Sequence, residues 1–347
     1  MSSETPFAMT PHLETLLARR ELQPEAAREV MEAIMAGRVG SASLAGFLTA
    51  LRAKGETENE IAVFAAVLRE KAVRVQAPPE TLDTCGTGGD RSDTFNISTA
   101  VALVAAGMGI PVAKHGNRSV SSRSGSADVL KTLGVNIEAP VPVLERCLRE
   151  VGLAFLFAPV HHPGLKHAAP VRREMGIRTV FNLLGPLANP ALPRRQLLGV
   201  FDPQWCEVFA RVLKRLGSEA AIVACGIGPG GHACLDEVST WGPTLVARLH
   251  GGQVLRETVD PLAFGIRPPA PGALSVDGPE SSARVVRAVL DGAPGPAREI
   301  VCLNAAAAAL VAGKAADWQE GLACAARSID RGGAREVLRR LVEESNR

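Results

Sequence analysis

The stretch DTCGTGGDRSDTFN, residues 83–96, joins a short apolar segment to a long run with helical character. Gly86, Gly88 and Gly89 remove side chains from a tight turn, and Asp90 supplies a carboxylate. Glycines let backbone N–H groups approach an anion closely, and a helix N-terminus favours negative charge. The stretch therefore predicts a phosphate-binding loop between a strand and a helix, with an ordinary strand-to-helix turn as the alternative.

The predicted loop differs from two familiar nucleotide-binding motifs. No Gly-Lys-Ser or Gly-Lys-Thr follows it, as a P-loop requires, and Gly-Thr-Gly-Gly-Asp lacks the spacing of a dinucleotide-binding fingerprint. Asn96, Ser98 and Thr99 stand where residues 100–108 begin a helical pattern. The stretch therefore offers an amide and two hydroxyls at the predicted helix start.

The composition indicates a large α/β protein. The chain has 347 residues, of which 46% are hydrophobic and only 4% aromatic, so its core is built mainly from aliphatic residues. A chain of this length is expected to form two domains. The 34 glycines and 24 prolines are spread along the chain and indicate many short connections.

Charge, cysteines and hydropathy argue against several classes of protein. The formal net charge is +2 without a dense Lys/Arg block, so neither nucleic acid nor a membrane is an expected partner. Seven cysteines without a CxxC pair argue against a disulfide framework and a zinc site. The polar start MSSETPFAMTPHLETL lacks the apolar core of a secretory signal, and no apolar run reaches the length of a membrane span. We therefore expect a cytoplasmic protein.

Residues 10–75 have the pattern of a small helical domain, because apolar side chains recur along them at helical spacing. Thr57 and Glu60 form a predicted capping box before a helix over residues 61–75. Two prolines within residues 76–80 indicate a linker, after which the pattern changes.

From residue 81 onward, predicted strands and helices alternate. This order predicts a mostly parallel sheet flanked by helices, whose ligands lie beyond the carboxyl ends of the strands, where the glycine loop also lies. The predicted strands cover residues 110–114, 153–158, 196–201 and 220–225, with a hairpin of 244–249 and 253–257 across Gly251-Gly252. The predicted helices cover residues 99–108, 126–133, 141–151, 203–216, 281–290, 304–312 and 334–344.

A second candidate anion site follows the predicted strand 110–114. Lys114, Asn117 and Arg118 precede the Ser-rich stretch SVSSRSGSAD, residues 119–128. Lysine and arginine supply positive charge, and serines supply hydrogen-bond donors. A solvated Ser-rich loop is the alternative, but the position one strand–helix unit after the glycine loop favours a second anion contact.

A pair of carboxylates forms the third motif. Asp236 and Glu237 follow the Gly-rich segment 226–231. Mg²⁺ is usually held by one or two protein carboxylates together with substrate phosphates, so the pair suits this ion. An Asp-Glu pair at an ordinary turn is the alternative.

The fourth motif is a basic segment that contains prolines. His161, His162 and Lys166 precede Arg172 and Arg173. On a helix the two arginines point about 100° apart, so only one can face a given ligand. Arginine binds a carboxylate through two parallel hydrogen bonds. A surface ion pair is the alternative.

Together these motifs resemble the anthranilate phosphoribosyltransferase family, within the wider two-domain family of nucleoside phosphorylases and phosphoribosyltransferases. The resemblance covers nearly the whole chain, in order. It rests on LRAKGET, GTGGD, TFNIST, VAKHGNR with SGSAD, FAPVHHPGLK, PVRREMGIRTVFNLLGPLANP, LDEVS and REIVCLNAAAAAL.

The resemblance implies an enzyme that transfers the 5-phosphoribosyl group of 5-phosphoribosyl-1-pyrophosphate (PRPP) to the amine of anthranilate. The products are N-(5-phosphoribosyl)anthranilate and pyrophosphate, in tryptophan biosynthesis. The resemblance also implies Mg²⁺, two ions per active site, and a homodimer formed largely through the small domains. The implied domains are a small helical domain over residues 1–76, completed near 165–185, and a large α/β phosphoribosyl-binding domain over 81–164 and 186–347.

Matching positions imply three sets of site residues, and no obligatory base, although His115 lies nearby. The implied PRPP-binding residues are Gly86, Gly89, Asp90, Thr94, Asn96, Ile97, Ser98, Thr99, Lys114, His115, Gly116, Asn117, Arg118, Ser119, Val120, Ser121, Ser122 and Ser126. The implied anthranilate-binding residues are Gly86, Asn117, His162, Arg172 and Gly185. The implied Mg²⁺ ligands are Ser98, Asp236 and Glu237.

The sequence departs from the family's pattern at three places. Arg91 stands where glycine is usual, and Gly164-Leu165 stands where Ala-Met is usual. The turn over residues 226–235 is longer, with Cys234 where glycine is common. These departures bear on rate and loop mobility more than on the type of reaction.

Two other functions fit parts of the sequence. A nucleoside phosphorylase of the same architecture would need a nucleobase pocket and no metal pair, so Asp236-Glu237 and VRREMG count against it. A catalytically silent relative that binds nucleic acid would have lost phosphate or metal residues and gained a basic face, and the sequence shows neither change.

Overall fold

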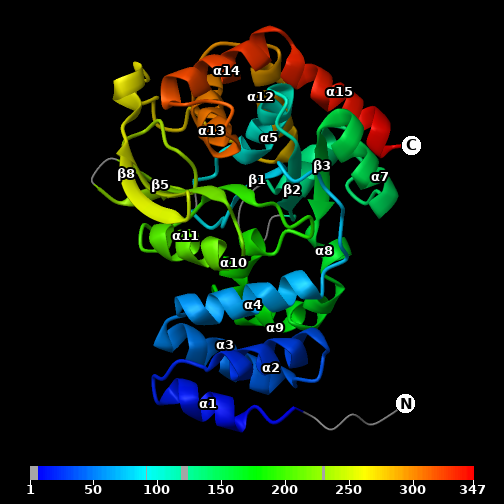
Figure 1. Cartoon of the computed structure of the whole chain (residues 1–347), viewed down its shortest axis with the longest axis vertical. Coiled ribbons are helices and arrows are strands. Elements are labelled where there is room, and N and C mark those ends of the chain that lie inside the picture. Colours follow the sequence, from blue (N-terminus) through cyan, green and yellow to red (C-terminus); the bar gives the residue numbers. More distant parts are fainter. Residues whose placement is uncertain (1–6, 91, 119–123, 229–230) are drawn as a thin grey trace. The chain divides into compact units, whose positions relative to one another are not determined.

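The computed structural model describes residues 7–90, 92–118, 124–228 and 231–347. The chain divides into two compact units (Figure 1). One comprises Met1–Val73 and Pro159–Pro190 and is called the helical unit below. The other comprises Arg74–Ala158 and Ala191–Arg347 and is called the sheet unit. Each unit is therefore built from two separate stretches of the chain.

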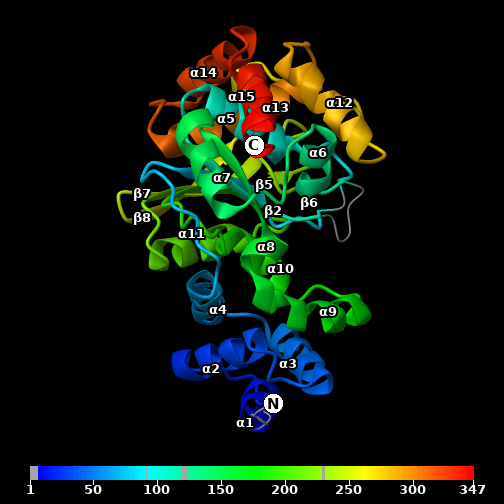
Figure 2. The ribbon, with the colours of Figure 1, turned by 90° about the vertical axis from the view of Figure 1, so that its right-hand side faces the viewer.

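The helical unit packs around an aromatic pair. Phe47 and Phe64 are buried edge to face, with ring centroids 6.4 Å apart. Figure 2 shows the first stretch of this unit in blue and the second in green. The first stretch forms α1 Thr10–Leu17, α2 Pro24–Met35, α3 Ser41–Lys54 and α4 Glu58–Glu70. The second contains α9 Ala169–Met175 and α10 Val180–Leu184, besides shorter turns.

The predicted capping box at the start of α4 is confirmed, although the helix ends before residue 75. Thr57 Oγ1 accepts from the Glu60 N–H at 3.2 Å, and the Glu60 carboxylate accepts from the Thr57 N–H at 2.9 Å. The same buried carboxylate binds Lys54 Nζ at 2.8 Å and the Leu22 N–H at 3.1 Å. A buried charge requires such partners. The Lys-Gly-Glu-Thr turn therefore joins α3, α4 and the connection between α1 and α2.

The described strands of the sheet unit form one eight-stranded sheet, ordered β3-β2-β1-β4-β5-β7-β8 with β6 beside β5. The predicted class, a mostly parallel sheet flanked by helices beside a helical domain, is confirmed. The parallel strands are β1 Leu82–Gly86, β2 Val112–Gly116, β3 Leu153–Phe157, β4 Arg195–Gly199 and β5 Ala220–Ile227. The antiparallel strands are β6 Ala233–Leu235, β7 Thr244–His250 and β8 Gln253–Val259.

Two features of the sheet bear on function and on the predictions. The strand order changes direction between β1 and β4, which is where doubly wound sheets bind ligands beyond the strand ends. At the far edge, β7 and β8 pair across the two-residue turn Gly251-Gly252, which confirms the predicted hairpin.

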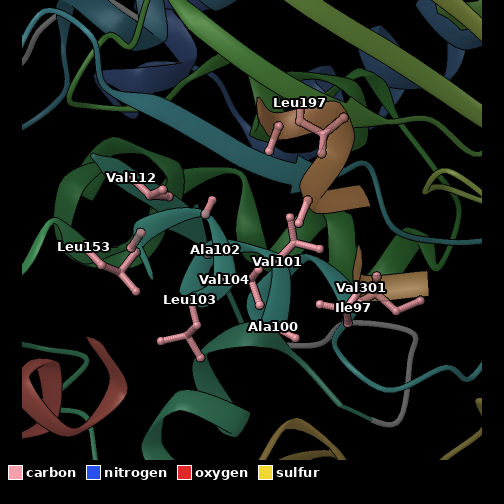
Figure 3. Packing of buried hydrophobic residues seen from close by; sticks show 14 of the residues in the cluster. Ile97, Ala100, Val101, Ala102, Leu103, Val104, Val112, Leu153, Leu197 and Val301 are labelled. Atoms are coloured by element: carbon pink, nitrogen blue, oxygen red, sulfur yellow. The ribbon is translucent and has the colours of Figure 1, made fainter. Parts of the chain in front are cut away.

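Helices cover both faces of the sheet. Helices α5, Ile97–Gly107, and α13, Pro296–Ala312, lie on one face, and α11, Trp205–Arg215, lies on the other (Figure 1). Helix α5 is apolar all round and therefore buried at the centre of the core. Figure 3 shows its residues among side chains from neighbouring elements, including Val112, Leu153, Leu197 and Val301.

The remaining helices refine the predictions. The predicted helix over residues 141–151 is confirmed in its bounds, and its second half, Cys147–Val151, is a π-helical turn after α7, Val141–Arg146. Helix α14, Trp318–Asp330, was not predicted, although Leu322, Ala325 and Ile329 recur along it at helical spacing and face the core. The other helices are α6 Ser126–Thr132, α12 Pro279–Leu290 and α15 Gly333–Ser345. Among the described residues, none of the helices combines the length and apolar character needed to cross a membrane.

Candidate active site

The acidic segment Asp236-Glu237 crosses the carboxyl ends of β1 and β4. Gly86 and Gly199 end these strands and pair with each other in the sheet. A Cβ atom at Gly86 would lie 2.3 Å from Asp236 Oδ2, and one at Gly199 would lie 1.4 Å from the Asp236 carbonyl oxygen. Both glycines are therefore required by the close approach of the acidic segment.

Replacing Gly199 with alanine is expected to lower the free energy of unfolding by about 3 kcal/mol, because the Asp236 backbone must move. Gly46→Ala is the control, since its Cβ would come no closer than 3.8 Å to Leu13. Alanine replaces glycine inside a helix there and should stabilise the protein by about 0.5–1 kcal/mol. Thermal unfolding followed by circular dichroism compares the two variants. A Gly199→Ala variant as stable as the wild type would show that the segment does not press on β4.

The glycine loop after β1 is tied to the acidic segment by its backbone. The Gly88 N–H donates to Asp236 Oδ2 at 2.6 Å, and the Asp236 N–H donates to Asp90 Oδ2 at 3.4 Å. Gly88 and Gly89 have φ angles of +68° and +80°, which L side chains rarely adopt. The predicted phosphate loop and the predicted carboxylate pair, distant in sequence, are therefore adjacent.

The acidic segment holds two carboxyls whose ionised forms the protein alone disfavours. Loss of hydration raises the pKa of Asp236 well above its ordinary value, and the charges of Asp90 and Glu237 raise it further. Burial raises the pKa of Glu237 from 4.5 to about 8, while the Lys114 charge opposes this shift. Within the described residues, no three His, Cys, Asp or Glu side chains form a complete metal cage. Two carboxyls with raised pKa values, which together make an incomplete set of protein ligands, fit Mg²⁺. This ion takes its remaining ligands from water and substrate phosphate.

Lys114, in the middle of β2, is a buried cation beside this segment. Its ammonium donates to the Thr84 carbonyl at 2.6 Å and to Ser98 Oγ at 3.1 Å. Burial lowers the pKa of Lys114, and the charges of Asp83, Cys85 and the acidic segment oppose that shift. Lys114 therefore joins β1 to the first turn of α5.

The N-terminus of α5 offers polar groups that differ in their availability. The Asn96 Oδ1 accepts from Ser124 Oγ at 2.8 Å and from Ser282 Oγ at 2.9 Å, so this side chain links three segments. The Ile97 side chain lies in the core, and its N–H donates to the Phe95 carbonyl at 2.7 Å. Thr99 Oγ1 is buried without a hydrogen-bond partner among the described residues. An orphaned hydroxyl beside a helix N-terminus fits an anionic ligand.

Further predicted residues lie in the last part of β2, in the loop after it and at the start of α6. The His115 N–H donates to Asp83 Oδ1 at 3.3 Å, and Ser126 Oγ donates to the Asn117 carbonyl at 3.3 Å. Arg118 is exposed and lies 3.8 Å from Asp128. Thr94, in the first loop, forms an isolated bridge with Ser275. The predicted residues Ser119, Val120, Ser121 and Ser122, and the unusual Arg91, lie outside the described residues.

The fourth motif belongs to the helical unit. His162 is buried, Arg172 is half-buried on α9, and Arg173 is exposed, so the two arginines differ as the helical spacing predicts. The Arg172 guanidinium carbon lies 5.1 Å from the centre of the Phe181 ring. Burial alone lowers the pKa of Arg172, and no carboxylate contributes to the shift. Gly185 follows α10, and a Cβ atom there would meet nothing within 4 Å.

Two supporting residues were not predicted. Asn304, buried in α13, accepts from the Val238 N–H at 2.8 Å and donates to the Val238 carbonyl at 2.8 Å, so it fixes the backbone next to Glu237. Asp83, fully buried in β1, accepts hydrogen bonds from β2 and β4. The sequence did contain a sign that Asn304 makes buried hydrogen bonds, because it is a single polar residue within a run of apolar residues.

The sequence matches two family profiles. Residues 10–72 match the profile described as "Glycosyl transferase family, helical bundle domain", and residues 78–335 match "Glycosyl transferase family, a/b domain". An anthranilate phosphoribosyltransferase of Rhodospirillum rubrum is 50% identical over 93% of this chain and 92% of its own length. The chain belongs to the anthranilate phosphoribosyltransferase family.

Solved structures of anthranilate phosphoribosyltransferases share the fold over nearly the whole chain. The enzyme of Thermus thermophilus is 40% identical with a TM-score of 0.88, over 96% of this chain and 99% of its own. The enzyme of Saccharomyces cerevisiae in complex with PRPP and Mg is 27% identical with a TM-score of 0.88, over 97% and 98%. The same yeast enzyme in complex with 4-fluoroanthranilate is 26% identical with a TM-score of 0.86, over 97% and 98%.

Proposed function

We propose that this enzyme transfers the 5-phosphoribosyl group from PRPP to the amine of anthranilate, giving N-(5-phosphoribosyl)anthranilate and pyrophosphate, in tryptophan biosynthesis. One observation carries the proposal beyond family membership. The glycine loop donates a backbone N–H to the carboxylate of Asp236 beyond the ends of β1 and β4, so the proposed anion loop and the proposed cation site are adjacent. A diphosphate bound with Mg²⁺ requires this combination.

The proposed PRPP contacts follow the two loops of the sheet unit. The backbone of the glycine loop and the first turn of α5 supply N–H groups, and Lys114 supplies a buried positive charge. The orphaned Thr99 hydroxyl supports a contact to phosphate. The proposed residues are Gly86, Gly89, Asp90, Thr94, Asn96, Ile97, Ser98, Thr99, Lys114, His115, Gly116, Asn117, Arg118, Ser126 and the four residues 119–122.

We propose that Asp236 and Glu237, with Ser98, hold Mg²⁺, with two ions per active site. The raised pKa values of both carboxyls support this, because a bound cation would favour their ionised forms. When bound, Mg²⁺ supplies positive charge next to the pyrophosphate leaving group. Lys114 lies on the same side and adds to that charge.

The proposed reaction is displacement at the anomeric carbon of the ribose. The bond from this carbon to pyrophosphate breaks, a bond to the anthranilate nitrogen forms, and the nitrogen releases one proton to solvent. Bond breaking runs ahead of bond making, so backbone and side-chain donors act mainly by stabilising the leaving group. An arylamine is neutral at pH 7 and needs no strong base before it attacks. Holding it about 3–3.5 Å from the carbon is the larger task.

The proposed anthranilate-binding residues are those that the family pattern implies. Gly86 and Asn117 belong to the sheet unit, whereas His162, Arg172 and Gly185 belong to the helical unit. Arg172 is the proposed partner of the carboxylate, because its guanidinium has no carboxylate neighbour within the described residues. A planar guanidinium binds a carboxylate through two parallel hydrogen bonds.

The purified protein with PRPP and Mg²⁺ is expected to consume anthranilate, seen as loss of its fluorescence, and to release one pyrophosphate per molecule consumed. Chelation of Mg²⁺ should stop both signals. Phosphate-dependent cleavage of a nucleoside, with no loss of anthranilate, would instead indicate a nucleoside phosphorylase. Retention of nucleic acid in a gel without either reaction would indicate the silent binding protein.

We further propose a cytoplasmic homodimer joined largely through the helical units. An interface on that unit would cover the exposed apolar side chains Leu17 and Ile177, which are 68% and 49% exposed. Light scattering of the purified protein should give twice the mass of one 36.4 kDa chain. A mass of one chain at micromolar concentration would overturn the dimer.

A further inference from the structure

The guanidinium of Arg172 lies over the face of a buried aromatic ring. Its central carbon is 5.1 Å from the centre of the Phe181 ring, and the Phe181 side chain is only 5% exposed. A cation this close to an aromatic face is attracted by the negative charge of the ring face. Arg172 forms no ion pair with the described carboxylates, so the ring is its main partner.

Arg172 and Phe181 belong to two helices joined by a short turn. Helix α9 ends at Met175 with Gly176 as its C-cap, and α10 starts after Thr179, whose N–H donates to Asn182 Oδ1 at 3.0 Å. The turn between the helices is also fastened to α3, because the Arg52 guanidinium donates to the Arg178 carbonyl. The turn that places the Phe181 ring beside the Arg172 guanidinium is therefore held by hydrogen bonds.

A ring beside the cation has a specific consequence for an arginine. The ring occupies one side of the guanidinium, and N–H groups on its other sides stay available for a carboxylate. An aliphatic side chain would fill the same space but would not attract the cation or align its plane. Fixing the plane before binding lowers the entropy that the ligand must overcome.

We propose that Phe181 is a positioning residue, whose ring holds the Arg172 guanidinium in the orientation that receives the carboxylate of the acceptor. This inference rests on the proposed function, in which Arg172 binds anthranilate. The ring does not touch the substrate in this account. It sets the affinity for an aromatic amine that carries a carboxylate, and it leaves PRPP binding unchanged.

The test replaces Phe181 with residues that fill space with and without a ring. Phe181→Leu and Phe181→Met remove the ring, and Met adapts its shape to the space left behind. Both should raise KM for anthranilate by about threefold to thirtyfold, the range that corresponds to a cation–π contact. Phe181→Tyr keeps the ring and should stay within about twofold of the wild type. KM for PRPP should not change in any of the three variants.

A matched control separates positioning from general packing. Phe47→Leu removes a buried ring from the same unit, where its partner is the Phe64 ring and not a cation. Phe47→Leu should lower the unfolding temperature by about as much as Phe181→Leu does, but it should leave KM for anthranilate unchanged. In an Arg172→Lys background, Phe181→Leu should raise KM for anthranilate less than it does in the wild type. The guanidinium that the ring positions is already absent there.

Several outcomes would overturn the proposal. A wild-type KM for anthranilate in Phe181→Leu and Phe181→Met would show that the ring does not position Arg172. An equal rise in Phe47→Leu, or in Phe181→Tyr, would show that packing alone is responsible. If the wild-type enzyme does not consume anthranilate, the proposed function fails and this inference fails with it. An active wild type with unaffected ring variants overturns only this inference.

Discussion

Glu237→Gln is expected to reduce kcat/KM by more than about 100-fold, because loss of a direct metal ligand should exceed the 10- to 100-fold typical of supporting residues. Glutamine keeps the shape of the side chain and removes its charge. The acidic segment should stay in place, since the neighbouring Val238 backbone is held by Asn304. Steady-state rates over a Mg²⁺ titration test the assignment. Unchanged turnover at every Mg²⁺ concentration would remove Glu237 from the metal site.

The same variant makes a prediction about stability. Folding raises the pKa of Glu237 from 4.5 to about 8, so the folded state holds the proton more tightly than the unfolded chain. Ionisation of this carboxyl therefore lowers the free energy of unfolding as pH rises between these two values. Glutamine cannot ionise, so without Mg²⁺ Glu237→Gln should unfold at the same or a higher temperature than the wild type at pH 8. A clearly lower unfolding temperature would mean that the ionised carboxylate stabilises the fold.

Arg172→Lys is the second change with a large expected effect. Lysine keeps the charge but cannot form two parallel hydrogen bonds to a carboxylate. Loss of a charged hydrogen-bond partner costs about 1.5–3 kcal/mol, so kcat/KM for anthranilate should fall roughly ten- to a hundredfold. KM for PRPP should be nearly unchanged, because the proposed phosphate contacts lie on loops of the sheet unit.

The adjacent arginine provides the control for this prediction. Arg173 is exposed on the same helix, so Arg173→Ala should leave both Michaelis constants close to the wild type. Each substrate is varied in turn at saturating concentrations of the other. A larger fall in kcat/KM for anthranilate in Arg173→Ala than in Arg172→Lys would mean that the wrong arginine has been assigned. No effect from either change would indicate that the acceptor is not anthranilate.

Much of the sheet unit could be predicted because its signals are local. Glycines, carboxylates and hydroxyls occur within residues 83–99, and a strand end next to a helix start gives them one physical role. The capping box at Thr57 and the hairpin at Gly251-Gly252 also depend on neighbouring residues, and the structure confirms both. Local chemistry of this kind is readable from a sequence.

The supporting contacts could not be predicted, because they join residues distant in the chain. Asn96 is bound by Ser282, 186 positions later, and Val238 is held by Asn304, 66 positions later. No local pattern specifies such partners. The contact between Arg172 and Phe181 joins two short helices whose boundaries the residue pattern did not give.

Two elements in the C-terminal part and near residue 150 show different limits. Helix α14 was missed although its signal was present, because Leu322, Ala325 and Ile329 recur at helical spacing. Its close contact with α13, where a Cβ atom at Gly321 would lie 2.9 Å from the Ala306 Cα, is not visible in the sequence. The π-helical turn at Cys147–Val151 keeps a helical pattern of residues and differs only in its backbone hydrogen bonds.

A crystal structure of the protein with PRPP and Mg²⁺ tests the central claim most directly. The claim is that the glycine loop and the acidic segment form one site for a metal-bound diphosphate. We expect the pyrophosphate group within hydrogen-bond distance of the N–H groups of residues 86–90 and of the first turn of α5, with Mg²⁺ bound to the Glu237 carboxylate. Pyrophosphate bound elsewhere on the sheet unit, with no metal at Asp236 or Glu237, would contradict it.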